Sequence, residues 1–147
     1  MIIAVVDGMG GSIGSQIVLG LRQAFPEDTE IIALGTNAIA TGGMMKAKAT
    51  RGATGENAIA FSIGEADVIM GSLSVVVPNS MMGEVTPEIA TAVASARGRK
   101  VLLPISNPPL DILGTSKKPL QQLIKDAIEL VGRQYGLPFA SEEKEDV

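Results

Sequence analysis

The residues best suited to chemistry lie between positions 7 and 14, where an aspartate precedes four glycines. Five apolar residues at 2–6 come before them and suit a strand buried on both faces. From Ile13 to Leu21, apolar residues recur at helical spacing. A glycine turn between a strand and a helix lets backbone N–H groups and the helix N-terminus face an anion. We therefore expect a nucleotide phosphate to bind here, the alternative being a turn that only connects the two elements. The residues of this predicted site are Asp7, Gly8, Gly10, Gly11, Ser12 and Gly14.

The glycine spacing does not match the dinucleotide fingerprint G-x-G-x-x-G, because Ile13 stands where the third glycine belongs. The acid that binds the ribose about 20 residues further on is missing as well. The second predicted strand ends instead in Gly35, Thr36 and Asn37. These differences weaken an NAD assignment, although a 2′-phosphate could still be held by a polar or cationic side chain. The candidates for that role are Thr36, Lys46 and Arg51.

Beyond the turn, apolar runs alternate with helical patterns. Strands are expected at 30–34, 67–70, 74–77, 100–106 and 111–114. Helices are expected at 12–25, 87–96 and 120–131, with a further helix that ends near residue 63. A cap for that further helix is available at Thr54 or Asn57. Residues 38–49 predict a helix that Gly42 and Gly43 make short or broken.

Alternating strands and helices predict an α/β fold, here a three-layer α/β/α Rossmann-like domain with a mainly parallel sheet of about five strands. We expect a single domain at 1–140 and an acidic, disordered tail at 141–147. Pro104 removes a ladder donor, so its strand should lie at a sheet edge or carry a bulge. Gly20, inside the first helix, is explained if that helix packs closely on the sheet.

The carboxyl ends of parallel strands form the ligand-binding edge of such a sheet. Here those ends are small or polar, at 7–14, 35–37, 71–72 and 106–107. We expect the amides of residues 10–14 to hold phosphate, Asp7 and Asn37 to reach the sugar, and two further asparagines to close the site. The residues that this adds to the predicted site are Thr36, Asn37, Gly71, Ser72, Asn79 and Asn107.

Several side chains near this edge have two interpretations. Asp7 could bind a ribose hydroxyl or Mg²⁺, or it could cap the adjacent turn through its own backbone. Glu56 and Glu84 also stand in glycine-rich loops, where most carboxylates are simply solvated. The Met81–Met82 pair follows a proline and precedes a glycine, which favours a subunit contact slightly over the core.

Composition argues against several classes of function. The 147 residues carry a net charge of −4 and no basic stripe, which argues against nucleic acid and anionic membranes as partners. The chain has no cysteine and no histidine, so thiolate chemistry and the commonest general base are missing. We predict no metal site and identify no catalytic residue, so enzymatic activity stays open. Without a basic leader or a long apolar run, the default location is the cytoplasm, and self-association is expected most simply as a dimer.

Over nearly its whole length the chain resembles a family of small bacterial proteins classed as a domain of unknown function. The segments 5–14, 31–38, 52–59 and 79–87 carry the resemblance, which implies a Rossmann-like fold without an activity. A weaker likeness to the GTP-binding domain of bacterial tubulin-like proteins rests on residues 10–11, 36–37 and 50–55. Residues 105–113 are also similar to a segment of lactate and malate dehydrogenases in which an asparagine lies near the nicotinamide.

Two hypotheses about function follow. The first is a nucleotide-binding protein whose partner is a small-molecule nucleotide, with NAD(P)-type ligands slightly ahead of GTP-type ones. The second is a non-catalytic oligomeric scaffold or regulatory subunit, in which the glycine turn is structural and the methionine loop makes the contact.

Overall fold

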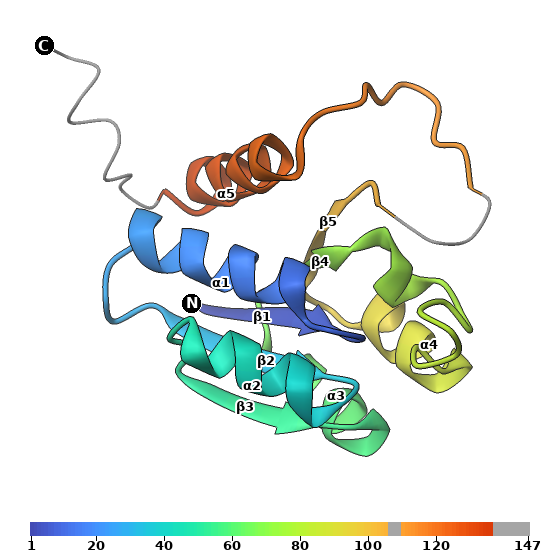
Figure 1. Ribbon diagram of the computed structural model, residues 1–147. Coiled ribbons are helices and arrows are strands. Elements are labelled where there is room, and N and C mark those ends of the chain that lie inside the picture. Colours follow the sequence, from blue (N-terminus) through green and yellow to red (C-terminus); the bar gives the residue numbers. More distant parts are fainter. Residues whose placement is uncertain (106–109, 137–147) are drawn as a thin grey trace, which may run out of the picture.

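The sheet contains five strands, and every pairing among the described residues is parallel. The computed structural model describes residues 1–105 and 110–136. The strands are β1 (Ile2–Asp7), β2 (Glu30–Gly35), β3 (Arg51–Thr54), β4 (Val68–Ser72) and β5 (Arg99–Leu103). Their order in the sheet is β3-β2-β1-β4-β5, so the first strand lies at the centre (Figure 1). The predicted Rossmann-like α/β fold with about five strands is confirmed.

Among the described residues, five α-helices cover the two faces of this sheet. They are α1 (Ser12–Ala24), α2 (Ala38–Lys46), α3 (Glu56–Ser62), α4 (Pro87–Ser95) and α5 (Leu120–Tyr135), with 3-10 turns η1 (Ile63–Glu65) and η2 (Leu73–Val76). Residues of α1, α2 and α5 share one apolar core with the sheet, and residues of α3 and α4 share the other. Ile3 and Val5 enter the first core, whereas Ala4 and Val6 enter the second. The unbroken apolar run of β1 therefore reflects burial on both faces.

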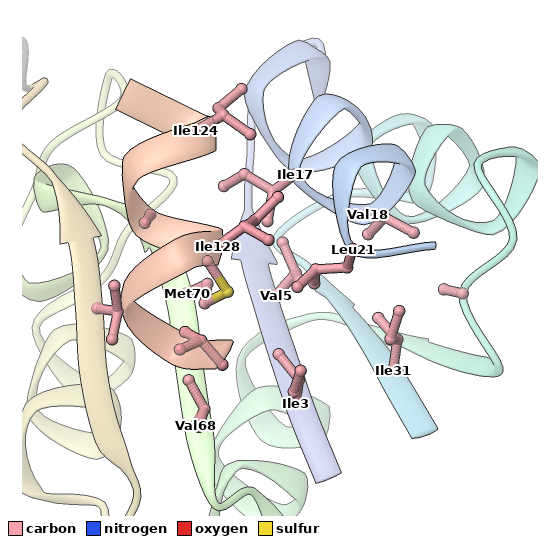
Figure 2. Packing of buried hydrophobic residues seen from close by; sticks show 14 of the residues in the cluster. Ile3, Val5, Ile17, Val18, Leu21, Ile31, Val68, Met70, Ile124 and Ile128 are labelled. Atoms are coloured by element: carbon pink, nitrogen blue, oxygen red, sulfur yellow. The ribbon is translucent and has the colours of Figure 1, made fainter. Parts of the chain in front are cut away.

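In the first core, α1 and α5 lie over the sheet with their apolar side chains facing each other (Figure 2). Ile17 and Leu21 of α1 and Ile128 of α5 are buried there. Gly20 permits this approach, because a Cβ atom at that position would lie 2.6 Å from Ile128 Cδ1. The glycine inside α1 therefore serves a helix–helix contact, and the predicted helix–sheet explanation is wrong.

Two predicted strands are not strands, and one strand was not predicted. Residues 73–76 form η2, because the chain turns directly after β4 and buries Val75 in the second core. Residues 111–114 are exposed and form no strand. The unpredicted strand is β3, an edge strand in which only Ala53 is half-buried. Its exposed sequence contains no apolar run, so pairing with β2 alone defines it as a strand.

The side chain of Asn37 starts α2 by accepting the Ala40 N–H at 2.9 Å. The helix is short, as predicted, but runs unbroken through Gly42 and Gly43. A Cβ would fit at either position, because it would lie 3.9 Å from the Cβ of Ser15 at Gly43 and would meet nothing within 4 Å at Gly42. Ala40, Thr41 and Met44 of this helix are buried, so tertiary packing outweighs the low helix propensity of the two glycines.

The other boundaries follow local chemistry to differing degrees. The residue preceding α3 is Gly55, and neither Thr54 nor Asn57 caps that helix. The start of α4 is confirmed, because Thr86 Oγ1 accepts the Ile89 N–H at 3.1 Å. β5 is an edge strand, as the proline at 104 predicted, and that proline follows its last residue.

The described helices include none with both the length and the apolar character needed to cross a bilayer. The predicted tail at 141–147 lies outside the described residues.

Candidate functional site

The glycine turn lies at the carboxyl end of the central strand, where the sheet changes its direction of growth. From β1 the chain continues to β2 and β3 on one side, then crosses to β4 and β5 on the other. Such a switch point opens a crevice between neighbouring loops, and ligands of α/β sheets bind there. The predicted edges at 7–14, 35–37 and 71–72 do meet at this end of the sheet. Asn107 lies outside the described residues.

Asp7 points into the turn rather than out of it. One carboxylate oxygen accepts the Gly8 N–H at 2.8 Å and the other accepts the Gly14 N–H at 2.6 Å. The side chain is 4% exposed, and this burial raises the pKa of Asp7, while the two N–H bonds oppose the rise and the charge of Glu84 adds to it. The geometry thus matches the capping interpretation, since both oxygens are bound to the main chain.

Gly14 is needed for the same arrangement. A Cβ atom there would lie 2.8 Å from both Asp7 Cβ and Met44 Sδ. Gly11 has a φ of +74° and stands where a Cβ would meet the Cα of Ala40 at 2.6 Å. These two glycines therefore permit the tight turn and its packing against α2. At Gly10, by contrast, a Cβ would meet nothing within 4 Å.

The remaining amides of the turn separate into bound and unbound groups. The Met9 N–H donates to Glu84 Oε1 at 2.9 Å, and the Gly11 N–H donates to the Gly8 carbonyl at 3.0 Å. Among the described residues, no acceptor binds the N–H groups at positions 10, 12 and 13. These three amides stand at the amino end of α1, where the helix dipole favours negative charge. Backbone geometry of this kind binds phosphate in many α/β proteins.

Glu84 is the functional candidate that sequence reasoning left among solvated carboxylates. Its Oε1 atom accepts hydrogen bonds from Thr36 Oγ1 at 2.7 Å, Asn37 Nδ2 at 2.8 Å and the Met9 N–H. The pKa of Glu84 is lowered, first by the Thr36 hydroxyl and then by the Met9 amide, because these donors favour the ionised form. A carboxylate from the loop before α4 therefore stands at the end of β2. The only sequence signal for it is its position in a glycine-containing loop.

Backbone strain is concentrated in the two loops that Glu84 joins. Met9 has a φ of +53°, and Asn79, Met81 and Met82 have φ values between +56° and +65°. The left-handed conformation costs a non-glycine residue roughly 1 kcal/mol or more. Strain of this kind persists where the surrounding structure demands it and is typical of ligand-binding sites.

Two hollows flank the turn. The larger, of about 630 Å³, lies on the β2 side and is lined by Met9, Gly10, Asn37, Ala38, Ile39 and Glu84. The smaller, of about 240 Å³, lies toward β4 and is lined by residues 7–13 together with Ser72, Ser74, Met81 and Ile105. Met9 and Gly10 belong to both, whereas Ser12 and Ile13 line the smaller hollow alone.

The predicted site residues do not all reach these hollows. Thr36 is half-buried and donates to Glu84, and Asn37 lines the larger hollow while bridging Met9 and Glu84. Gly71 is buried in β4, where a Cβ would lie 2.7 Å from the Val6 carbonyl oxygen. Asn79 is exposed and lines neither hollow.

The structure places the three candidates for a 2′-phosphate contact differently: the Thr36 hydroxyl already donates to Glu84, whereas Arg51 lies away from the turn. Arg51 begins β3 and therefore lies at the amino edge of the sheet, opposite the turn. It forms ion pairs with Glu30 at 2.8 Å and Glu65 at 2.6 Å. Lys46 is the last residue of α2. The larger hollow borders the opposite, amino end of that helix. No lysine or arginine is among the residues that line either hollow.

The Met81–Met82 pair divides between core and surface. Met81 is 7% exposed and packs in the second core, whereas Met82 is 89% exposed. A subunit contact therefore stays a prediction for Met82 alone, because Met81 belongs to the core.

Fold and site together define a Rossmann-like α/β domain with a glycine turn at its switch point. The chain belongs to the family described as Domain of unknown function (DUF3842), whose model matches residues 2–136. The predicted membership of a family without assigned function is thereby confirmed. A comparison with curated proteins found no match.

Among solved structures, the chain is similar to a dodecameric FMN-dependent UbiX-like decarboxylase from Escherichia coli O157:H7. The sequence identity is 13%, the TM-score is 0.49, and the match covers 93% of this chain and 96% of the other.

Proposed function

We propose that this protein binds a nucleotide, with the phosphates at the glycine turn and NAD-type dinucleotides as the leading class of ligand. The observation that carries the proposal is the set of three amides, at Gly10, Ser12 and Ile13, that no acceptor among the described residues binds. They lie at the start of a 13-residue helix or just before it; all three residues line the smaller hollow, and Gly10 lines the larger one as well. A phosphate at this position satisfies the amides and meets the positive end of the helix dipole.

The two hollows favour a dinucleotide over a mononucleotide. One lies toward β2 and the other toward β4, with the turn between them. A pyrophosphate on the turn would direct one nucleoside into each hollow, which is how dinucleotides cross a switch point. The larger hollow, about 630 Å³, is within the ordinary range for small-molecule sites.

The test is a thermal-shift and calorimetric screen with NAD⁺, NADP⁺, FMN, FAD, ATP and GTP. A ligand at 100 times its Kd stabilises the folded protein by about 2.7 kcal/mol, so its melting temperature rises measurably. Binding should be lost in Gly10→Leu, because a side chain there enters open space beside the amides without disturbing the fold. Gly64→Leu is the matched control, because Gly64 is equally unobstructed and lies before β4, at the opposite edge of the sheet. Absence of a shift with every ligand would overturn the proposal.

Self-association is a second candidate property, favoured by large apolar side chains that the protomer leaves exposed. Met82 is 89% exposed and Leu113 is 95% exposed. Burial of such side chains against another copy is the usual reason for a scaffold to assemble. Light scattering coupled to size-exclusion chromatography measures the mass directly, and a strictly monomeric protein would contradict this candidate.

A further inference from the structure

The hydrogen bonds of Glu84 leave one of its oxygens available for a ligand. Oε1 accepts all three donors, from Met9, Thr36 and Asn37. Among the described residues, no donor binds Oε2. The carboxylate is thus held from one side by the ends of β1 and β2, while the residue itself lines the larger hollow.

The loop that carries Glu84 is rigidly attached to the fold. The buried Ser80 hydroxyl donates to the carbonyls of Ser74 and Val77, and the Asn79 N–H donates to the Val85 carbonyl at 2.7 Å. Met81 and Val85 on either side are buried in the second core. The carboxylate therefore does not need to be ordered by a ligand, which favours binding.

The chemistry of the larger hollow selects for hydroxyl groups and against phosphate. Its lining contains one carboxylate, no lysine and no arginine, with Met9 and Ile39 as apolar walls. A carboxylate accepts hydrogen bonds from hydroxyl groups, whereas a second anion beside it is repelled. The donors on Oε1 keep Glu84 ionised at neutral pH, because they lower its pKa.

We propose that Glu84 is the ribose-binding carboxylate of the nucleotide site, taking the place of the acid that is missing at the end of β2. This inference rests on the proposed nucleotide binding and adds the ligand class: a ribonucleotide with free 2′ and 3′ hydroxyls. Ligands with a 2′-phosphate, or without the 2′ hydroxyl, bind less well. The carboxylate reaches this place from the loop before α4, rather than from the strand that usually supplies it.

The test compares matched ligands by calorimetry on the wild-type protein. The pairs are NAD⁺ with NADP⁺ and GTP with 2′-deoxy-GTP, so that one pair applies whichever base the site accepts. We expect at least about a tenfold preference for the free diol, because hydrogen bonds to a charged group are the stronger ones. Equal affinity within the pair that binds would overturn the ribose role while leaving the proposed function intact. Absence of binding in both pairs would overturn the ribose role, and the proposed function falls as well only if no other ligand of the screen binds.

Variants then assign the preference to this side chain. Glu84→Gln should reduce the discrimination within the pair by about tenfold, because it removes the charge and one acceptor while keeping the shape. Glu56→Gln is the matched control, because Glu56 also stands beside a glycine but lines neither hollow. A preference unchanged in Glu84→Gln would contradict the assignment. The wild-type comparison decides the ligand class even if the variant folds poorly.

Discussion

At the scale of single residues, the pKa values of the two carboxylates near the turn are shifted in opposite directions for different reasons. Asp7 is buried, and the loss of hydration raises its pKa despite two backbone donors. Glu84 keeps some contact with solvent and accepts three hydrogen bonds on one oxygen, which lowers its pKa. Asp7 therefore shapes the turn, whereas Glu84 is the carboxylate that lines the larger hollow.

Replacing Glu84 by Gln should lower the melting temperature near neutral pH, and the difference from wild type should shrink in acid. The folded-state pKa of Glu84 lies below 4.5, so its ionised form stabilises the native state above that value. This contribution is lost as the pH falls through the folded pKa. Thermal denaturation of both proteins between about pH 7 and about pH 3 measures the difference. A difference that does not change with pH would contradict the assigned cause.

At the scale of elements, the contact between the turn and α2 depends on the absence of a side chain. Gly11 combines a positive φ with a backbone neighbour, the Cα of Ala40, at 2.6 Å from an added Cβ. The added Cβ and the Cα of Ala40 cannot separate unless α1 or α2 moves. Gly10, one residue away, has no such neighbour. Adjacent glycines in one turn therefore serve different purposes, one structural and one available to a ligand.

Gly11→Ala should destabilise the fold by about 2 kcal/mol or more, because the left-handed backbone and the clash with α2 add together. Gly10→Ala should change the free energy of unfolding by no more than about 0.5 kcal/mol. Urea denaturation of the two variants beside the wild type gives both values. Equal destabilisation would show that the turn tolerates neither change and would remove the distinction drawn here.

At the scale of the whole molecule, one copy leaves apolar side chains on opposite faces of the sheet. Met82 projects from the loop before α4, on the face that carries the second core, while Leu19 of α1 lies on the other face. If two copies pair through the loop that carries Met82, the contact covers Met82 and leaves Leu19 exposed. The two positions therefore test where a contact between copies lies.

Met82→Lys should weaken self-association by more than about tenfold, because it places a charge in the contact. Both side chains are unbranched, so the positive φ at this position costs the same in either protein. Leu19→Lys is the control and should leave the mass unchanged. Sedimentation at several concentrations measures the effect, and an assembly unaffected by Met82→Lys would place the contact elsewhere.

An element could be predicted where the residues that determine it are close together in the sequence. β1, the glycine turn and α1 were predicted because an unbroken apolar run indicates burial on both faces and apolar residues at helical spacing indicate a helix. β3 was not, because an exposed edge strand needs no apolar pattern. The strand predicted at 74–77 was wrong, because β-branched side chains occur in a buried 3-10 turn as well as in a strand. Glu84 was not identified because its partners are up to 75 residues away in the chain.

The sequence by itself determined the layers of the domain and the position of the glycine turn, since both follow from the apolar pattern and from missing side chains. Only the tertiary structure decided which N–H groups of that turn are bound within the protein and which are not. Asp7 binds the amides at Gly8 and Gly14, Glu84 binds the one at Met9 and the Gly8 carbonyl binds the one at Gly11, so three of the seven amides at 8–14 are left without an acceptor among the described residues. The physical reason is that each N–H group binds whichever acceptor the fold brings within reach, and distance along the chain does not reveal which acceptor that is.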